Sequence, residues 1–183
     1  MGSPRRGGNN HRLLDRALEG ARSAGAETEE IVLIDLDIAP CRGCGGCADG
    51  APCVVNDDTA SLLSRIELAD GLIVAAPLFF CGVPAHAKAM IDRCQPIWSQ
   101  QHRAPPDRPS ADRRAASICT GGAHREPNFT GAQLTLRAFF ATLGFVVVEE
   151  VTVGALEAPD DVLGRPQALE RAFWAGRRVA SRP

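Results

Sequence analysis

The sequence predicts an α/β fold, in which helices cover both faces of a parallel β-sheet. Short apolar runs rich in β-branched residues alternate along the chain with segments of helical periodicity, which is the pattern of such a sheet. The length of 183 residues, with 45% hydrophobic and 23% charged residues, is typical of one packed globular domain. We therefore expect a single doubly wound domain over residues 1–183.

The first two predicted elements are a helix and a buried strand. Asn9 and Asn10 can cap a helix over residues 10–24, whose apolar residues recur three and four positions apart. Gly25 favours the end of this helix. Residues 31–36, IVLIDL, form a short apolar run with β-branched residues, which predicts a strand covered on both faces.

The middle of the chain predicts a helix, a strand and a second helix. Asp57 and Asp58 offer an N-cap for the first of these helices. Residues 71–76, GLIVAA, are typical of a buried strand. Pro84 suits the first turn of a helix that runs toward Trp98.

The last third of the chain continues the alternation. Residues 99–113 are polar and proline-rich, which indicates an exposed loop. Strands are expected over residues 114–119 and 145–153, with a helix between them that ends near Leu143. Pro166 opens the last predicted helix.

The start of the chain lacks a strand that this architecture requires. The loop GSPRRGGNN leads directly into a helix, whereas in a doubly wound sheet such a loop follows the carboxyl end of a central strand. Loss of a central strand would expose the edges of its neighbours. We therefore expect a five-stranded sheet whose first strand is missing or truncated at the N-terminus. Of two explanations, a start of the sequence assigned a few residues too late is favoured over a native chain that is truncated.

Charge and hydropathy exclude two classes of partner. Twenty Lys and Arg residues against 22 Asp and Glu residues give a formal charge of −2, without the basic excess that nucleic-acid binding needs. The longest uncharged stretch, residues 71–85, is interrupted by prolines and is shorter than the roughly 20 residues of a membrane helix. The N-terminus does not resemble a secretory signal, so we expect a cytoplasmic protein whose seven cysteines are mostly reduced.

Three loops carry the residue types of a ligand crevice. Residues 2–10 combine small residues with a helix start, which suits a phosphate, and a flexible basic tail is the alternative. Residues 76–84 follow a buried strand and can face the rim of a flat heterocycle, unless Phe79 and Phe80 are ordinary core. Residues 120–122 allow close approach to a ligand or form a plain turn. Because the loops follow parallel strands, we expect them to converge.

Four of the cysteines form a compact motif within a loop insertion at 41–53. Cys41, Cys44, Cys47 and Cys53 have the spacing C-x2-C-x2-C-x5-C. Thiolates at this spacing, separated by glycines and an arginine, can hold the irons of a [4Fe–4S] cluster, which is the favoured interpretation. A zinc site and a metal-free dithiol or disulfide are the two alternatives.

The sequence resembles a known family in five segments: GSPRRGGNN, IAPCRGCGGC, PCVVNDD, APLFFCGVPAHAKAMIDRCQPIW and GAQLTLRAFFATLGF. It is similar to the flavodoxin-like NAD(P)H-dependent FMN reductase superfamily, and within it to the iron–sulfur flavoproteins. The resemblance covers nearly the whole chain. It implies a flavodoxin-like fold, FMN as cofactor and NAD(P)H as co-substrate.

The resemblance also implies the cofactor-binding residues. The phosphate site would be made by Ser3, Arg5, Asn9 and Asn10. The flavin ring would be contacted by Pro77, Leu78, Phe79, Phe80, Gly82, Thr120, Gly121 and Gly122. Asn10 and Cys81 depart from the family pattern, which usually has Thr or Ser at the first position and often has Gly or Tyr at the second.

The expected function is an FMN-dependent oxidoreductase that passes electrons from a nicotinamide nucleotide, through flavin, to an iron–sulfur cluster or a small acceptor. The alternatives are a cluster-free quinone or nitro-compound reductase, and an FMN carrier between protein partners. The resemblance further implies a homodimer or homotetramer. No catalytic acid, base or nucleophile is assigned, because the cofactors carry the chemistry.

The remaining candidates receive modest roles. Cys81 is expected to be a small core residue rather than a reactive thiol, and Cys94 and Cys119 are expected to serve packing. His86 is expected at the surface. His124 and Arg125 have a surface role or meet the nucleotide.

Overall fold

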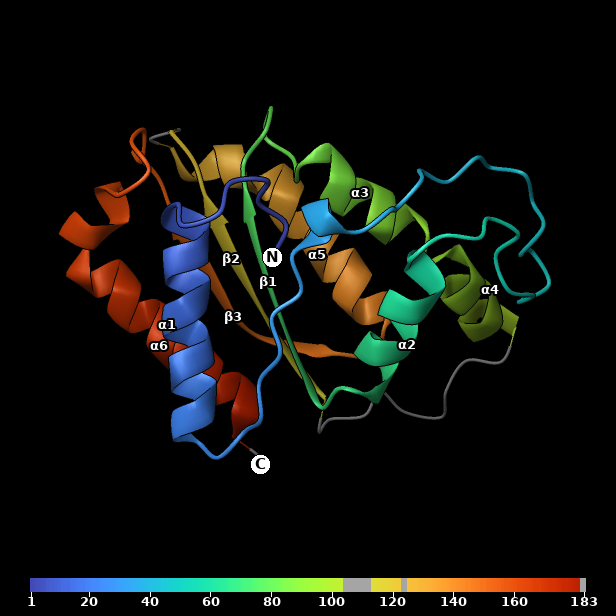
Figure 1. Ribbon diagram of the computed structural model, residues 1–183, viewed down its shortest axis with the longest axis horizontal. Helices are drawn as coiled ribbons and strands as arrows, with labels where there is room; N and C mark the ends of the chain where they lie inside the picture. The colour runs from blue at the N-terminus through green and yellow to red at the C-terminus, as the bar shows by residue number, and fades with distance from the viewer. Residues whose placement is uncertain (104–112, 123–124, 182–183) are drawn as a thin grey trace.

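The computed structural model describes residues 1–103, 113–122 and 125–181, which form three layers (Figure 1). Helices α1 and α6 cover one face of a parallel sheet, and α2, α3 and α5 cover the other. The strands are β1 (Gly71–Pro77), β2 (Arg114–Thr120) and β3 (Val146–Val153), in that spatial order. The helices are α1 (Asn9–Ser23), α2 (Thr59–Leu68), α3 (Ala85–Asp92), α4 (Gln95–Arg103), α5 (Thr130–Thr142) and α6 (Pro166–Ala180), with 3-10 turns η1 (Leu33–Asp35), η2 (Glu126–Phe129) and η3 (Asp161–Gly164). The predicted α/β class is confirmed.

Strand β2 lies at the centre of the three described strands and is buried on both faces. Ala116 and Ile118 belong to the core under α1 and α6, while Ala115 and Cys119 belong to the core on the opposite face. This two-sided burial explains why the strand reads as a continuous apolar run rather than an alternating one. The strand ends at Thr120, on the edge of the sheet that carries the predicted loops.

Helices α1 and α6 approach each other closely through glycines. A Cβ atom at Gly176 would lie 1.7 Å from the carbonyl oxygen of Ala17, and one at Gly20 would lie 1.9 Å from that of Phe173. Neither position has room for a larger side chain. The contact fixes the direction of α1, whose first turn therefore lies at the carboxyl edge of the strands (Figure 1).

The predicted strand over 31–36 is wrong. In the described residues the sheet has three strands rather than five, and η1 occupies part of this segment. Met1 lies between the segment and β1: its amino group donates to the carbonyl of Ile31, its carbonyl accepts from Leu33 N–H at 3.0 Å, and Gly2 N–H donates to Ala75 at 2.7 Å. One residue of parallel pairing does not support a strand, because each strand residue needs partners along the ladder.

The helix predicted from Pro84 toward Trp98 is divided into α3 and α4. Pro96 cannot continue α3, because its ring would clash with the carbonyl of Asp92 and it has no N–H to donate. Helix α4 then extends to Arg103, so the exposed loop expected over 99–113 begins later than predicted. Residues 104–112 of that loop lie outside the described residues.

Candidate functional site

The first turn of α1 carries backbone N–H groups that have no partner in the described residues. The first hydrogen bond of α1 runs from Arg12 N–H to the carbonyl of Gly8 at 3.0 Å, so the N–H groups of residues 9–11 remain at the positive end of the helix. The hydroxyl of Ser3, which is buried, accepts from Arg5 N–H at 3.1 Å. A helix start of this kind binds anions.

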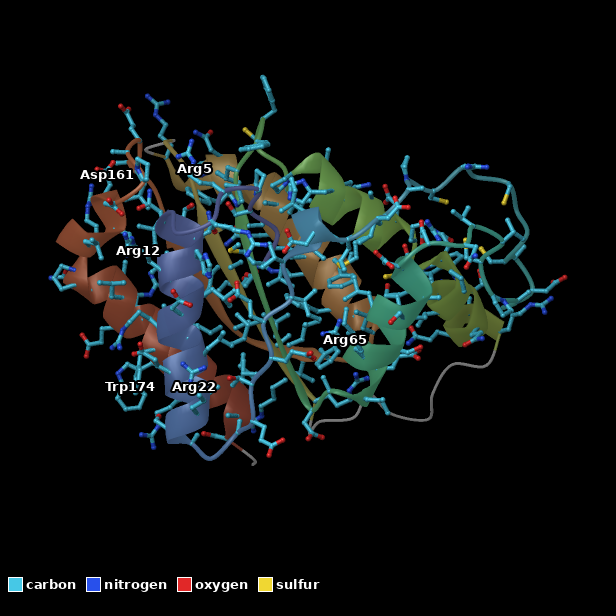
Figure 2. The ribbon with its side chains drawn as sticks, viewed as in Figure 1. Arg5, Arg12, Arg22, Arg65, Asp161 and Trp174 are labelled. Carbon is cyan, nitrogen blue, oxygen red and sulfur yellow. The ribbon has the colours of Figure 1, made fainter. Side chains whose placement is uncertain are left out.

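Arg5 adds a positive charge to this loop. Among the described residues its guanidinium makes no ion pair, whereas the neighbouring Arg6 is paired with Asp35. The side chain of Arg5 folds back over the loop, since a Cβ at Gly8 would lie 3.1 Å from its Cδ atom. Figure 2 shows Arg5 above the start of α1. The loop therefore offers both backbone donors and a cation to a negatively charged ligand.

The adjacent residues Asn9 and Asn10 have different surroundings. The side chain of Asn9 donates to the carbonyl of Ala158 at 2.7 Å and accepts from Val162 N–H at 3.0 Å, so it fastens the loop before η3. Asn10 is buried and donates to the hydroxyl of Thr120, and its oxygen Oδ1 has no partner in the described residues. Asn9 can therefore serve an anion through its backbone N–H, and Asn10 joins two of the predicted loops.

The loop after β1 forms a tight exposed turn. Phe79 and Gly82 exchange backbone hydrogen bonds of 2.9 and 3.0 Å. Between them, Phe80 and Cys81 have φ values of 50° and 61°, in the left-handed region that ordinary side chains rarely occupy. Phe80 is fully exposed and Phe79 half-exposed, so neither is ordinary core. Cys81 is exposed, and its prediction as a core residue is wrong.

The three predicted loops meet at the carboxyl edge of the sheet. Leu78 N–H donates to the carbonyl of Thr120 at 2.7 Å, and Gly121 lies against the Leu78 side chain, where a Cβ would come within 3.2 Å. The N-terminal loop joins them through Asn10. His86, at the start of α3, adds a fourth contact, because its Nε2 atom lies 2.8 Å from the carbonyl of Gly2. The expected convergence of the three loops is confirmed by these contacts, and a ligand crevice between them stays a prediction.

The predicted ligand residues differ in how open they are. Buried, partly buried and exposed positions all occur at the crevice. The buried members are Ser3, Asn10 and Thr120, the partly buried ones Asn9, Pro77, Leu78, Gly82 and Gly121, and the exposed ones Arg5, Phe79, Phe80 and Gly122. Arg125 is also exposed, and His124 lies outside the described residues.

The cysteine loop lies away from the crevice, beyond α2 and α4 (Figure 1). Cys41 and Cys44 are exposed, Cys47 and Cys53 are partly buried, and all four thiols are free. The outer part of the loop is held by α4, where Gln100 donates to the carbonyl of Gly50 at 2.9 Å. In the described residues, no three of these sulfur atoms lie within 4.8 Å of one another.

Sequence reasoning missed the residue that anchors this loop. Arg93, at the C-terminal end of α3, is buried and pairs with Asp57, which sequence reasoning assigned only to helix capping. The available signal in the sequence was that Arg93 stands among apolar residues near the end of a predicted helix, where a basic side chain can be buried. It was ambiguous, because such a residue more often caps the helix or points to solvent.

A surface hollow of about 530 Å³ lies between α1 and α6, remote from the crevice. Its lining includes Arg16, Phe173 and Trp174, with the Arg16 guanidinium 5.3 Å from the centre of the Phe173 ring. Trp174 is labelled on the outer face of α6 in Figure 2. None of the predicted ligand residues lines this hollow; they lie at the carboxyl edge of the strands, where the loops meet.

Within the part of the chain that the structure describes, no helix has both the length and the apolar character needed to cross a bilayer.

Comparison with known proteins places the chain among flavin-dependent reductases. A family model described as NADPH-dependent FMN reductase matches residues 1–160. A protein of Bacillus subtilis (strain 168), provisionally named an NAD(P)H-dependent FMN-containing oxidoreductase, is 30% identical over 177 residues, which is 93% of this chain and 91% of that protein. The solved structure of the Trp repressor binding protein from Bacillus subtilis has 28% identity and a TM-score of 0.64, with 98% and 96% of the two chains covered.

An iron–sulfur flavoprotein of Methanosarcina thermophila matches a shorter region. It is 41% identical over 92 residues, a match that covers 50% of this chain and 48% of that protein. The chain therefore spans about half the length of this relative.

Proposed function

The chain belongs to the NADPH-dependent FMN reductase family, and on that basis we propose that it binds FMN in the crevice and oxidises NAD(P)H. The observation that carries the proposal is the junction of the three loops at Thr120, which accepts from Leu78 N–H and from the Asn10 side chain. Ligands of open α/β sheets bind at this edge.

The N-terminal loop suits the phosphate of such a cofactor. The N–H groups of residues 9–11 and the guanidinium of Arg5, which makes no ion pair in the described residues, are donors that a phosphate requires. The Ser3 hydroxyl donates to the Arg5 carbonyl at 3.3 Å, and would turn to the phosphate when it is bound. Asn10 positions this loop from below through Thr120. We assign the phosphate to Ser3, Arg5 and the first turn of α1, with the Asn9 side chain serving the fold.

The other two loops would hold the flavin ring. Pro77, Leu78, Phe79, Phe80 and Gly82 provide one side, and Thr120, Gly121 and Gly122 the other. The left-handed turn at Phe80 and Cys81 costs on the order of 1–3 kcal/mol per residue, and such strain is concentrated at ligand sites. Bound FMN supplies the hydride and electron transfer, so the chain needs to bind and orient rather than to donate protons.

We further propose that Cys41, Cys44, Cys47 and Cys53 hold an iron–sulfur cluster, which would take electrons one at a time. Four free thiols on one glycine-rich loop are a suitable donor set.

The separation of the cysteine loop from the crevice favours a homodimer or homotetramer, in which this loop of one copy approaches the flavin of another. Size-exclusion chromatography with light scattering tests this arrangement, and a strict monomer would contradict it. We also propose a cytoplasmic location, since exposed free thiols are kept reduced there.

The deciding experiment is quantitation of flavin, iron and acid-labile sulfide in protein purified without oxygen. We expect one FMN per chain, a brown colour and steady oxidation of NADPH or NADH. The variant Ser3→Ala/Arg5→Ala should stay folded but lose most of its FMN, whereas Arg65→Ala, on the exposed face of α2, should keep it. Full FMN content in the double variant would remove the phosphate assignment.

The second candidate function is a cluster-free reductase of quinones or nitro-compounds. It is favoured by the match over 93% of the chain to the Bacillus subtilis relative, whose name mentions FMN and no cluster. A yellow preparation that oxidises NAD(P)H and contains no iron would select it. A flavin-containing protein that does not oxidise NAD(P)H would instead be an electron carrier.

A further inference from the structure

The two limbs of the cysteine loop, residues 37–39 on the outgoing side and 55–58 on the returning side, lie side by side and form its neck. A buried ion pair closes this neck. Arg93 and Asp57 form a bidentate contact of 2.6 and 3.1 Å, and their side chains are 1% and 4% exposed. In contrast, most ion pairs in the described residues lie at the surface, for example Arg65 with Glu29 at 41% and 66% exposure. Burial of two charges is costly unless the pair has good geometry and further hydrogen bonds, and Arg93 and Asp57 have both.

The same pair joins the two limbs of the loop. Arg93 donates to the carbonyl of Ala39 at 2.9 Å on the outgoing limb and to that of Val55 at 3.1 Å on the returning limb. Asp57 accepts from Ala39 N–H at 2.9 Å and from Thr59 N–H at 3.0 Å. Both limbs are therefore bonded to one guanidinium and one carboxylate.

A second contact lies just outside this pair. Asp58 N–H donates to the carbonyl of Asp37 at 3.0 Å, and the Asp58 carboxylate accepts from Asp37 N–H at 2.8 Å. Residues 40–54 between the limbs are mostly exposed, so the loop contributes little apolar burial of its own. The bonds at the neck and those from α4 to the outer part of the loop are then what orders it.

Cys53 is the thiol that depends on the neck. Cys41, Cys44 and Cys47 are three residues apart on the outgoing side. Cys53 stands on the returning side, two residues before Val55, whose carbonyl accepts from Arg93 at 3.1 Å. The joining of the two limbs therefore limits how far Cys53 can move from the other three thiols.

We propose that Arg93 and Asp57 are positioning residues that close the cysteine loop in the absence of any bound group and hold Cys53 in reach of the other three thiols. The proposal rests on the proposed cluster for its purpose and on the contacts above for its geometry. Helix α3 then connects the two sites, because its first residues follow the turn between Phe79 and Gly82 and its C-terminal end carries Arg93.

Limited trypsin digestion of the metal-free protein tests the closure directly. Trypsin binds several residues on each side of the cleaved bond in an extended form, and before Arg42 these residues include Ala39, which Arg93 and Asp57 hold. Cleavage after the exposed Arg42 is therefore slow while the neck is closed. The variant Arg93→Met/Asp57→Asn removes both charges and leaves one acceptor oxygen. We expect cleavage after Arg42, measured by mass spectrometry, to become at least tenfold faster. The control Arg65→Met/Glu29→Gln, which removes an exposed pair, should leave the rate unchanged.

The position of Cys53 is tested by loading iron and sulfide without oxygen. We expect the double variant to lose most of its iron while its FMN content stays close to that of the wild type; a general structural role would lower both together. Arg93→Lys keeps the charge but not both paired bonds, and should give intermediate cleavage and iron content; it is the variant to compare with the wild type if the double variant does not fold.

Equal cleavage rates in wild type, Arg93→Lys and the double variant would overturn the proposal. A wild type that takes up no iron, together with faster cleavage of the double variant, would instead reject the cluster while leaving the closure of the loop supported. Full iron loading in a variant that is cleaved rapidly would show that Cys53 needs no positioning, and would overturn that part of the proposal.

Discussion

The side-chain amide of Asn10 donates to the hydroxyl of Thr120, so the first turn of α1 is bonded to the end of β2. Both residues are buried. The contact joins residues that are far apart in the chain, and it connects the loop assigned to phosphate with a loop assigned to the flavin ring. A change at either residue is therefore expected to affect both halves of the crevice.

Removing this bond should weaken FMN binding. We expect Asn10→Ala and Thr120→Val each to raise the dissociation constant of FMN about tenfold, and their combination to cost less than the sum, with a coupling of about 1 kcal/mol. Titration followed by flavin fluorescence measures the constants. Thr135→Val, at an exposed hydroxyl on α5, is the matched control and should leave them unchanged. Additive effects of the two changes would contradict the coupling.

The strained turn after β1 should not tolerate a methyl group beneath it. A Cβ at Gly131 would lie 2.5 Å from the carbonyl oxygen of Cys81, so Gly131→Ala must displace the turn. We expect a loss of about 1–3 kcal/mol in the free energy of unfolding, together with weaker FMN binding. Gly164→Ala, where a Cβ meets nothing within 4 Å, is the control. Equal urea midpoints of the two variants would argue against the packing of this turn.

The seven thiols should divide by reactivity. Burial raises the pKa of Cys94 and of Cys119 to about 12, so almost none of either thiol is ionised at pH 8. Cys41, Cys44 and Cys81 are exposed. With iodoacetamide and metal-free protein, mass spectrometry should find these three alkylated at least tenfold faster than the buried pair. In urea all seven should react, and rapid native labelling of Cys119 would contradict its burial.

Asp57 should make stability fall in acid. Burial alone would raise the pKa of this carboxyl, but hydrogen bonds from Arg93 and from the N–H groups of Ala39 and Thr59 outweigh it and hold the pKa well below its usual range. A carboxyl whose pKa is lower in the folded than in the unfolded protein stabilises the fold. This stabilisation is complete above the pKa of the unfolded protein, near 4, and is lost progressively as the pH falls below that value.

We therefore expect the contribution of Asp57 to the free energy of unfolding to fall by about 1.4 kcal/mol for each pH unit below pH 4. Urea unfolding at several pH values measures the slope. In Arg93→Met/Asp57→Asn this part of the slope should be absent, and an unchanged slope would show that other carboxyls cause the acid sensitivity.

Neighbouring residues show how far sequence reasoning reaches at the site. Asn9 and Asn10 look alike in the sequence, and both were assigned to the phosphate through the family resemblance. Successive residues of a helix point about 100° apart, so Asn9 faces the loop before η3 while Asn10 faces Thr120. Their division of roles depends on which element packs on each side of α1, and that is a property of the fold.

The same reasoning explains the wrong strand at 31–36 and the wrong placement of Cys81. An apolar β-branched run indicates a strand only where a partner is present to pair with it, and in the described residues Met1 alone supplies one. Cys81 was expected in the core because cysteine is a small residue that is often buried, but the tight turn closed by the backbone bonds between Phe79 and Gly82 leaves it exposed.

Local patterns in the sequence were sufficient for the alternation of helices and strands, the loops at the carboxyl edge and the cysteine motif, because periodicity, turn residues and spacing act over a few positions. The tertiary structure alone decided which asparagine supports the crevice, where the cysteine loop lies and that Arg93 and Asp57 close it. Those relationships join residues far apart in the chain, and their hydrogen bonds form only when packing has brought the elements together and removed water from between them.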